Sequence, residues 1–79
     1  MKHAPTRTQK DLLDFIIQFY KTYDYRPSLR DMSEGKINNR LVIKSRTRQA
    51  TWRVVQRLIE KQWLEQRFFK NVAYWVPAD

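Results

Sequence analysis

The sequence predicts a small α+β domain, mostly helical, in which three helices precede a C-terminal β-hairpin. Two segments in the N-terminal half combine a capping residue with apolar residues at helical spacing. A third such segment follows in the second half, and two short runs rich in β-branched and aromatic residues end the chain. We expect a single domain over residues 1–79, of which residues 1–7 are frayed.

The first helix is expected to start at Thr8, because TQKD places a capping hydroxyl three residues before Asp11. Phe15 and Ile17 lie off its main apolar stripe, so they mark either a dimer patch or a satellite contact of the core. Pro27 ends this segment, because proline cannot continue a helix. The stripe itself consists of Leu12, Leu13, Ile16, Phe19, Tyr20 and Tyr23.

A second, short helix is expected directly after the proline. Ser28 and Asp31 form another capping box, and Gly35 is suited to the left-handed conformation that ends many helices. Residues 36–46 are expected to form a loop with some strand character, because INNR is typical of a turn while LVIK is rich in β-branched residues.

The third helix is expected to follow Thr47, an N-cap candidate, and to run to about Gln62. Its apolar stripe consists of Thr51, Val54, Val55, Leu58 and Ile59. Such a stripe predicts one buried side and one polar side.

The C-terminal hairpin is expected to pair residues 64–69 with residues 72–76. The turn falls at Lys70 and Asn71, because asparagine tolerates positive φ. We assign four aromatic residues to the core between this hairpin and the helices: Trp63, Phe68, Tyr74 and Trp75.

Positive charge is concentrated in one part of the chain. The sequence has 16 Lys and Arg against 8 Asp and Glu, a net charge of +8. From Gly35 to Ile59 there is no carboxylate, and the cations are Lys36, Arg40, Lys44, Arg46, Arg48, Arg53 and Arg57. A one-sided positive field is typical of a nucleic-acid surface, although membranes and acidic proteins are also suitable partners.

Several other classes of function are disfavoured. The chain has no cysteine, which excludes disulfides and thiolate zinc sites, and it has no apolar run long enough to span a membrane. His3 is the only histidine and has no ligand partner, and the paired carboxylates are explained by helix capping and the helix dipole. We therefore expect a cytoplasmic, nucleoid-associated protein that is not an enzyme and has no metal or cofactor.

The predicted order of helix, helix, helix and hairpin is that of a winged helix-turn-helix. The segments TQKDLLDFI, YRPSLRDM and LIEKQWL resemble the three helix signatures of the LexA-type winged-helix DNA-binding domain, and the similarity spans nearly the whole chain. The chain is longer than the family between Met32 and Thr47, and Gln62 stands where the family usually has glycine. The family's self-cleaving domain does not follow, so we expect no autoproteolysis.

The resemblance implies that the third helix reads DNA and that the hairpin is the wing. Gln49, Arg53 and Gln56 lie opposite the apolar stripe and are the candidate base readers, because arginine can bind guanine and glutamine can bind adenine in bidentate fashion. Trp52 either stacks on the duplex or belongs to the core edge. The predicted DNA-binding residues are Lys44, Arg46, Arg48, Gln49, Trp52, Arg53, Gln56, Arg57, Arg67 and Lys70.

The function predicted from these features is sequence-specific binding of double-stranded DNA by a small bacterial, phage or plasmid regulator such as a repressor. A homodimer is possible. Two alternatives stay open: the same scaffold binds an acidic host protein, or it binds RNA. The polar side of the third helix could also be merely solvated, and the hairpin charges could only protect a sheet edge.

Overall fold

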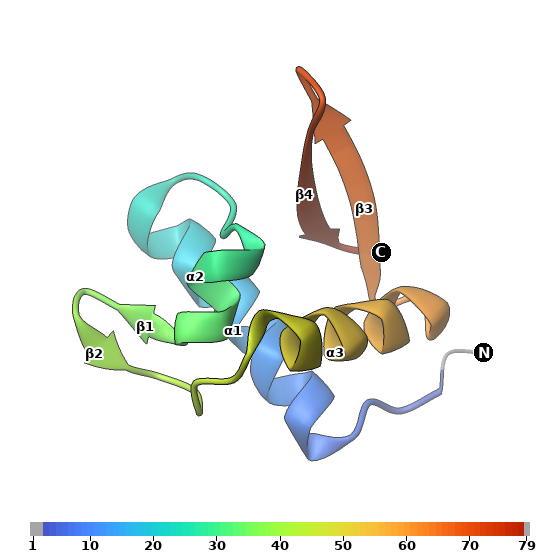
Figure 1. The fold of residues 1–79 in the computed structure, drawn as a ribbon. Helices are drawn as coiled ribbons and strands as arrows, with labels where there is room; N and C mark the ends of the chain where they lie inside the picture. Colours follow the sequence, from blue (N-terminus) through green and yellow to red (C-terminus); the bar gives the residue numbers. More distant parts are fainter. Residues whose placement is uncertain (1–2, 79) are drawn as a thin grey trace.

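The computed structural model describes residues 3–78 and contains three helices and two antiparallel hairpins (Figure 1). Residues 1 and 2, part of the segment expected to be frayed, lie outside the described residues. The elements are α1 (Arg7–Tyr23), α2 (Leu29–Glu34), β1 (Lys36–Ile37), β2 (Arg40–Leu41), α3 (Arg48–Glu60), β3 (Leu64–Phe69) and β4 (Val72–Pro77). The prediction of an α+β domain with three helices and a C-terminal hairpin is confirmed, and a short hairpin precedes α3.

Helix α1 begins two residues earlier than expected. Thr6, and not Thr8, is the N-cap: its hydroxyl accepts from the Gln9 backbone N–H at 3.3 Å, and the Gln9 side chain accepts from the Thr6 N–H at 3.0 Å. The Gln9 side-chain oxygen also accepts from Lys61 Nζ at 2.8 Å, and Trp63 Nε1 donates to the His3 carbonyl at 2.6 Å. These long-range contacts favour the earlier cap and hold residues 3–6 against the end of α3.

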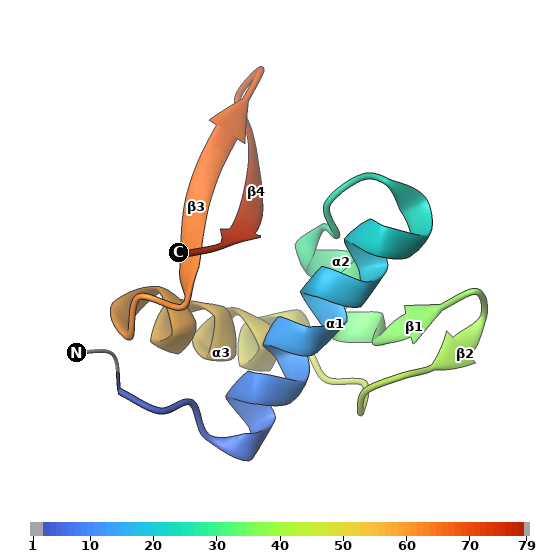
Figure 2. The same cartoon turned by 180° about the vertical axis from the view of Figure 1, so that it is seen from behind.

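The core forms where α1 crosses α3. The views from opposite sides show α3 in front of α1 in Figure 1 and behind it in Figure 2. Phe15 is 1% exposed and belongs to this core, so of its two interpretations the core contact is confirmed and the dimer patch is wrong. Helix α1 packs against α2, α3 and β4, which buries a wider face than one stripe provides. The buried apolar core consists of Leu12, Phe15, Ile16, Phe19, Met32, Ile37, Val55, Leu58, Leu64 and Trp75.

Helix α2 has the predicted boundaries. The Ser28 hydroxyl accepts from the Asp31 backbone N–H at 3.2 Å, and Gly35 ends the helix with φ of 68°. A Cβ on Gly35 would collide with the Ile43 carbonyl oxygen, so both the conformation and the close approach require glycine here.

Residues 36–41 form a hairpin where a loop with strand character was expected. Asn38 and Asn39 make the turn with φ of 53° and 63°, as the INNR segment indicated. The Asn38 N–H donates to the Tyr23 hydroxyl at 2.7 Å, and Ile37 is buried. Contacts with α1 therefore hold the hairpin in place.

Helix α3 begins at the predicted cap, where the Thr47 hydroxyl accepts from the Ala50 N–H at 3.1 Å. It ends in a Schellman arrangement: the Trp63 N–H donates to the Leu58 carbonyl at 2.9 Å, and the Gln62 N–H donates to the Ile59 carbonyl at 3.0 Å. Gln62 has φ of 66°, so it adopts the left-handed conformation that glycine favours.

The C-terminal hairpin has the predicted turn, with Lys70 and Asn71 at φ of 51° and 65°, and β4 runs one residue past the expected end at Val76. Its base is packed, because Leu64 and Trp75 are buried, whereas its tip projects away from the helices (Figure 1). Phe68 is 67% exposed, so its assignment to the core is wrong. Trp75 lies in the core as predicted. Trp63 is partly buried and packs against the core, and Tyr74 is half-buried.

Candidate nucleic-acid interface

One side of α3 is packed and the opposite side is open. Thr51, Val55 and Leu58 are buried against the other elements, as the stripe predicted. No ribbon among residues 3–78 crosses the outer side of this helix in Figure 1. We call this outer side the α3 ridge: Arg48, Gln49, Trp52, Arg53, Gln56 and Arg57, all exposed except Gln56, which is half-buried.

The guanidinium groups of the ridge form few ion pairs with carboxylates, and these pairs are weak. Arg57 donates to Glu60 at 3.3 Å, but both side chains are more than 60% exposed, so the pair contributes at most about 1 kcal/mol. Within residues 3–78, Arg53 has no carboxylate partner. A polyanion could therefore bind both guanidinium groups at little cost.

Trp52 stands at the edge of the ridge and touches the core. It is 38% exposed, and its ring centre lies 6.2 Å from that of Trp75 at an interplanar angle of 69°. Next to it, a shallow hollow of about 380 Å³ is lined by Trp52, Arg53, Gln56, Arg57 and Glu60. The geometry is compatible with both interpretations of Trp52, because one part of the ring is packed and another part meets solvent.

The basic loop before α3 is anchored to α2. The Arg46 N–H donates to the Ser33 carbonyl at 2.9 Å, and the Arg46 guanidinium donates to the Lys44 carbonyl at 3.3 Å. Lys44 and Arg48 are exposed, whereas Arg46 is half-buried. This loop thus brings two cations, Lys44 and Arg46, to the N-terminal end of the ridge, where Arg48 begins α3.

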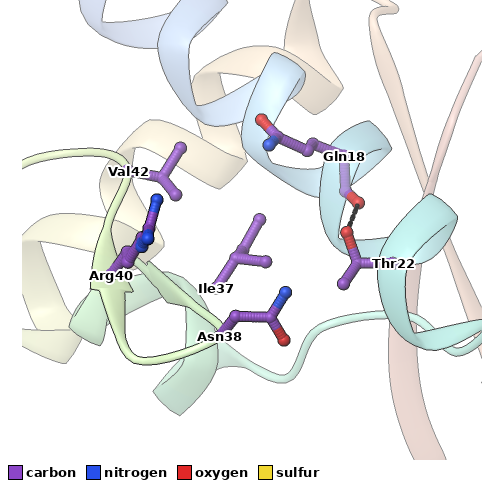
Figure 3. A pocket seen from close by; sticks show the side chains of 6 residues that line it. All are labelled: Gln18, Thr22, Ile37, Asn38, Arg40 and Val42. Carbon is purple, nitrogen blue, oxygen red and sulfur yellow. Dashed lines mark hydrogen bonds between the residues drawn. The ribbon is translucent and has the colours of Figure 1, made fainter.

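Arg40 does not extend the ridge. It lies beside a cavity between α1 and the first hairpin, which is lined by Gln18, Thr22, Ile37, Asn38, Arg40 and Val42 (Figure 3). The Thr22 hydroxyl there donates to the Gln18 carbonyl at 2.9 Å. The first hairpin therefore places its arginine near α1.

The two predicted cations of the C-terminal hairpin form a separate basic group. Arg67 pairs with Glu65 at 2.9 Å, and Lys70 Nζ lies 5.5 Å from the centre of the Phe69 ring. The hairpin rises from the end of α3 and its tip points away from that helix (Figure 1). Only a ligand long enough to span both groups would contact them together.

The apolar surface of the hairpin tip was missed by the sequence reasoning. Phe68, Phe69 and Val72 are exposed by 67%, 67% and 66%. A usable signal existed: consecutive residues of a strand point to opposite faces, so two adjacent phenylalanines beside a turn cannot both face the helices.

Within residues 3–78 no three histidine, cysteine or acidic side chains lie close enough together to hold a metal ion. None of the helices described is both long and apolar enough for a bilayer crossing. Comparisons with protein-family models, curated proteins and solved structures find no match to this chain.

Proposed function

We propose that the chain is a sequence-specific double-stranded DNA-binding protein of the winged helix-turn-helix type, a small regulator in which the α3 ridge enters the major groove. The observation that carries the proposal is the open, arginine-bearing outer side of α3, which neither hairpin covers. A helix about 10–12 Å wide fits a major groove about 12 Å wide.

The base-reading part of the ridge consists of Gln49, Arg53 and Gln56. These residues are spaced by four and three positions, so they form one row along the helix. Arginine recognises the O6 and N7 acceptors of guanine, and glutamine recognises N6 and N7 of adenine. This row supplies sequence preference.

The phosphate-binding part surrounds that row. Lys44, Arg46 and Arg48 lie where α3 begins, and Arg57 lies toward its other end. Arg67 and Lys70 on the hairpin contact the backbone beyond the groove, which is the role of a wing. Contacts of this kind orient the protein on the duplex and carry no sequence information.

A second candidate function is favoured by the exposed apolar tip of the C-terminal hairpin. In that case the scaffold binds an acidic host protein, with Phe68 and Phe69 as anchors and the cations as steering groups. Recovery of one stoichiometric protein partner from nuclease-treated lysate, together with failure to bind duplex DNA, would favour this function.

Duplex binding measured by fluorescence anisotropy over a series of salt concentrations tests the first function. If six to eight cations meet phosphates, log K falls against log salt with a slope of about −5 to −7. Arg53→Ala weakens binding, whereas Lys21→Ala, which removes one exposed charge from α1, changes it little. Absent binding, or an affinity that does not respond to salt, would contradict the proposal. A preference for single-stranded RNA over duplex DNA would identify RNA as the ligand instead.

A further inference from the structure

The tip of the C-terminal hairpin exposes three apolar side chains beside a cation. Phe69 and Val72 are paired across the hairpin immediately before the turn, and Phe68 precedes them. Lys70, in the turn, lies over the Phe69 ring. Phe68, Phe69 and Val72 are called the apolar tip below.

The apolar tip is two-sided. Phe68 lies on the same face of the hairpin as Trp75, which is buried at the base, whereas Phe69 and Val72 lie on the other face. A flat partner could cover only one of these faces. The shape therefore suits a partner that surrounds the tip, such as a groove or a stack of flat groups that the tip can enter.

The apolar tip is too small to hold a partner by itself. Two phenylalanines and a valine at two-thirds exposure offer on the order of 300–400 Å². A stable protein interface buries about 800 Å² on each partner. The tip alone is thus insufficient for a dimer, and it is better suited to extend an interface that another surface establishes. The α3 ridge is such a surface, and the cations of both groups attract an anionic ligand.

We propose that the apolar tip is a wedge that enters the minor groove beside the α3 site, opens a base step and bends the duplex. This inference rests on the proposed binding of DNA by α3. Phosphate attracts the Lys70 ammonium away from the Phe69 ring, which leaves the ring free to insert. Phe69 is the residue that inserts between the two base pairs. Phe68, on the other face of the hairpin, packs against the opposite side of the opened step.

The dimensions of the groove explain why insertion bends DNA. Paired strands lie about 4.8 Å apart and the minor groove of B-DNA is about 6 Å wide, so a hairpin with its side chains does not fit an undeformed groove. Apolar wedges open this groove and kink the duplex toward the major groove by on the order of 20–90°. A kink in that direction bends the duplex away from the hairpin tip, because the major groove of the opened step lies opposite the minor groove that the tip enters.

The test uses the complete chain and a mixed-sequence duplex that contains TA and CA/TG steps, which are the easiest to kink. Fluorophores at both ends report bending by energy transfer, and 2-aminopurine at these steps reports unstacking. The wild-type protein increases both signals. Phe69→Ser abolishes both increases and weakens binding by roughly tenfold or less, because the lost apolar contact is partly offset by the avoided unstacking.

Two variants separate a wedge from a general loss of apolar surface. Phe69→Leu keeps an apolar side chain at the tip and retains most of the bending. Leu41→Ser removes an apolar side chain of similar exposure from β2 and leaves bending, unstacking and affinity unchanged. Unaltered circular dichroism of each variant confirms that the fold is intact.

Four outcomes would overturn the inference, and each has a different meaning. No duplex binding by the wild-type chain removes both the α3 interface and the wedge. Salt-dependent binding without bending, or bending that Phe69→Ser leaves intact, removes the wedge alone. Binding to vesicles of phosphatidylserine and phosphatidylcholine that needs Phe69, without any effect of Phe69 on DNA, assigns the tip to a lipid surface instead.

Discussion

At the scale of single residues, positive φ angles show where the chain needs a left-handed backbone conformation and how well the residue type there suits it. Gly35 at φ of 68° has the residue type that this conformation favours, and Asn71 at 65° tolerates it. Gln62 at 66° is less suited, because an ordinary side chain in the left-handed region costs about 1–2 kcal/mol. It is held there by the two Schellman hydrogen bonds that lead from α3 into β3.

Gln62→Gly should therefore raise the free energy of unfolding by roughly 0.5–1 kcal/mol. Relief of the left-handed conformation exceeds the entropy that glycine adds to the unfolded chain, which costs about 0.5–1 kcal/mol. Urea unfolding followed by tryptophan fluorescence measures the change. Gln66→Gly, in the middle of β3, is the control and should be destabilising. Destabilisation by Gln62→Gly would show that the glutamine side chain makes a contact worth more than the strain.

At the scale of elements, the parts specified by short-range chemistry could be predicted and the parts that depend on neighbours could not. The caps at Ser28 and Thr47 and the turn at Lys70 and Asn71 each involve a few adjacent residues, and their predictions are confirmed. Thr6 replaced Thr8 as a cap because Gln9 contacts Lys61, more than fifty residues away.

The same distinction explains why the sequence left Phe15 open and placed Phe68 wrongly. Phe15 is buried because α1 is covered by several elements, which a single apolar stripe does not reveal. Phe68 is exposed because the hairpin extends beyond the helices that cover its base. In the candidate interface, the polar row of α3 could be predicted from helical periodicity. That neither hairpin covers this row could not be predicted, because it depends on the directions in which the hairpins leave the helices.

The proposed function assigns two kinds of binding residue to α3, and paired variants test this assignment. Arg53→Ala should weaken binding mainly to preferred sequences, by about 1–3 kcal/mol, because it removes a base contact. Arg48→Ala should weaken binding to all duplexes alike and reduce the magnitude of the salt slope by about 1. Competition between a selected duplex and random duplex distinguishes the two. Equal losses for both duplexes in both variants would contradict the assignment of Arg53 as a base reader.

At the scale of the whole molecule, the cations predicted to contact DNA lie in two groups, one along α3 with its preceding loop and one on the C-terminal hairpin. The net charge of +8 indicated an anionic partner, but a total charge does not say how its cations are distributed. A duplex is long enough to meet both groups, since ten base pairs span about 34 Å and the protein measures 36 Å in its longest direction.

Titration of the ¹⁵N-labelled protein with duplex DNA, followed by amide and indole NMR signals, shows which surface of the protein meets the duplex. We expect the largest shift changes from Lys44 to Arg57, and a change of the Trp52 indole N–H that exceeds that of the buried Trp75 indole. Shift changes confined to α1 and the first hairpin, with residues 44–57 unaffected, would contradict the assignment of the α3 ridge as the DNA-binding surface.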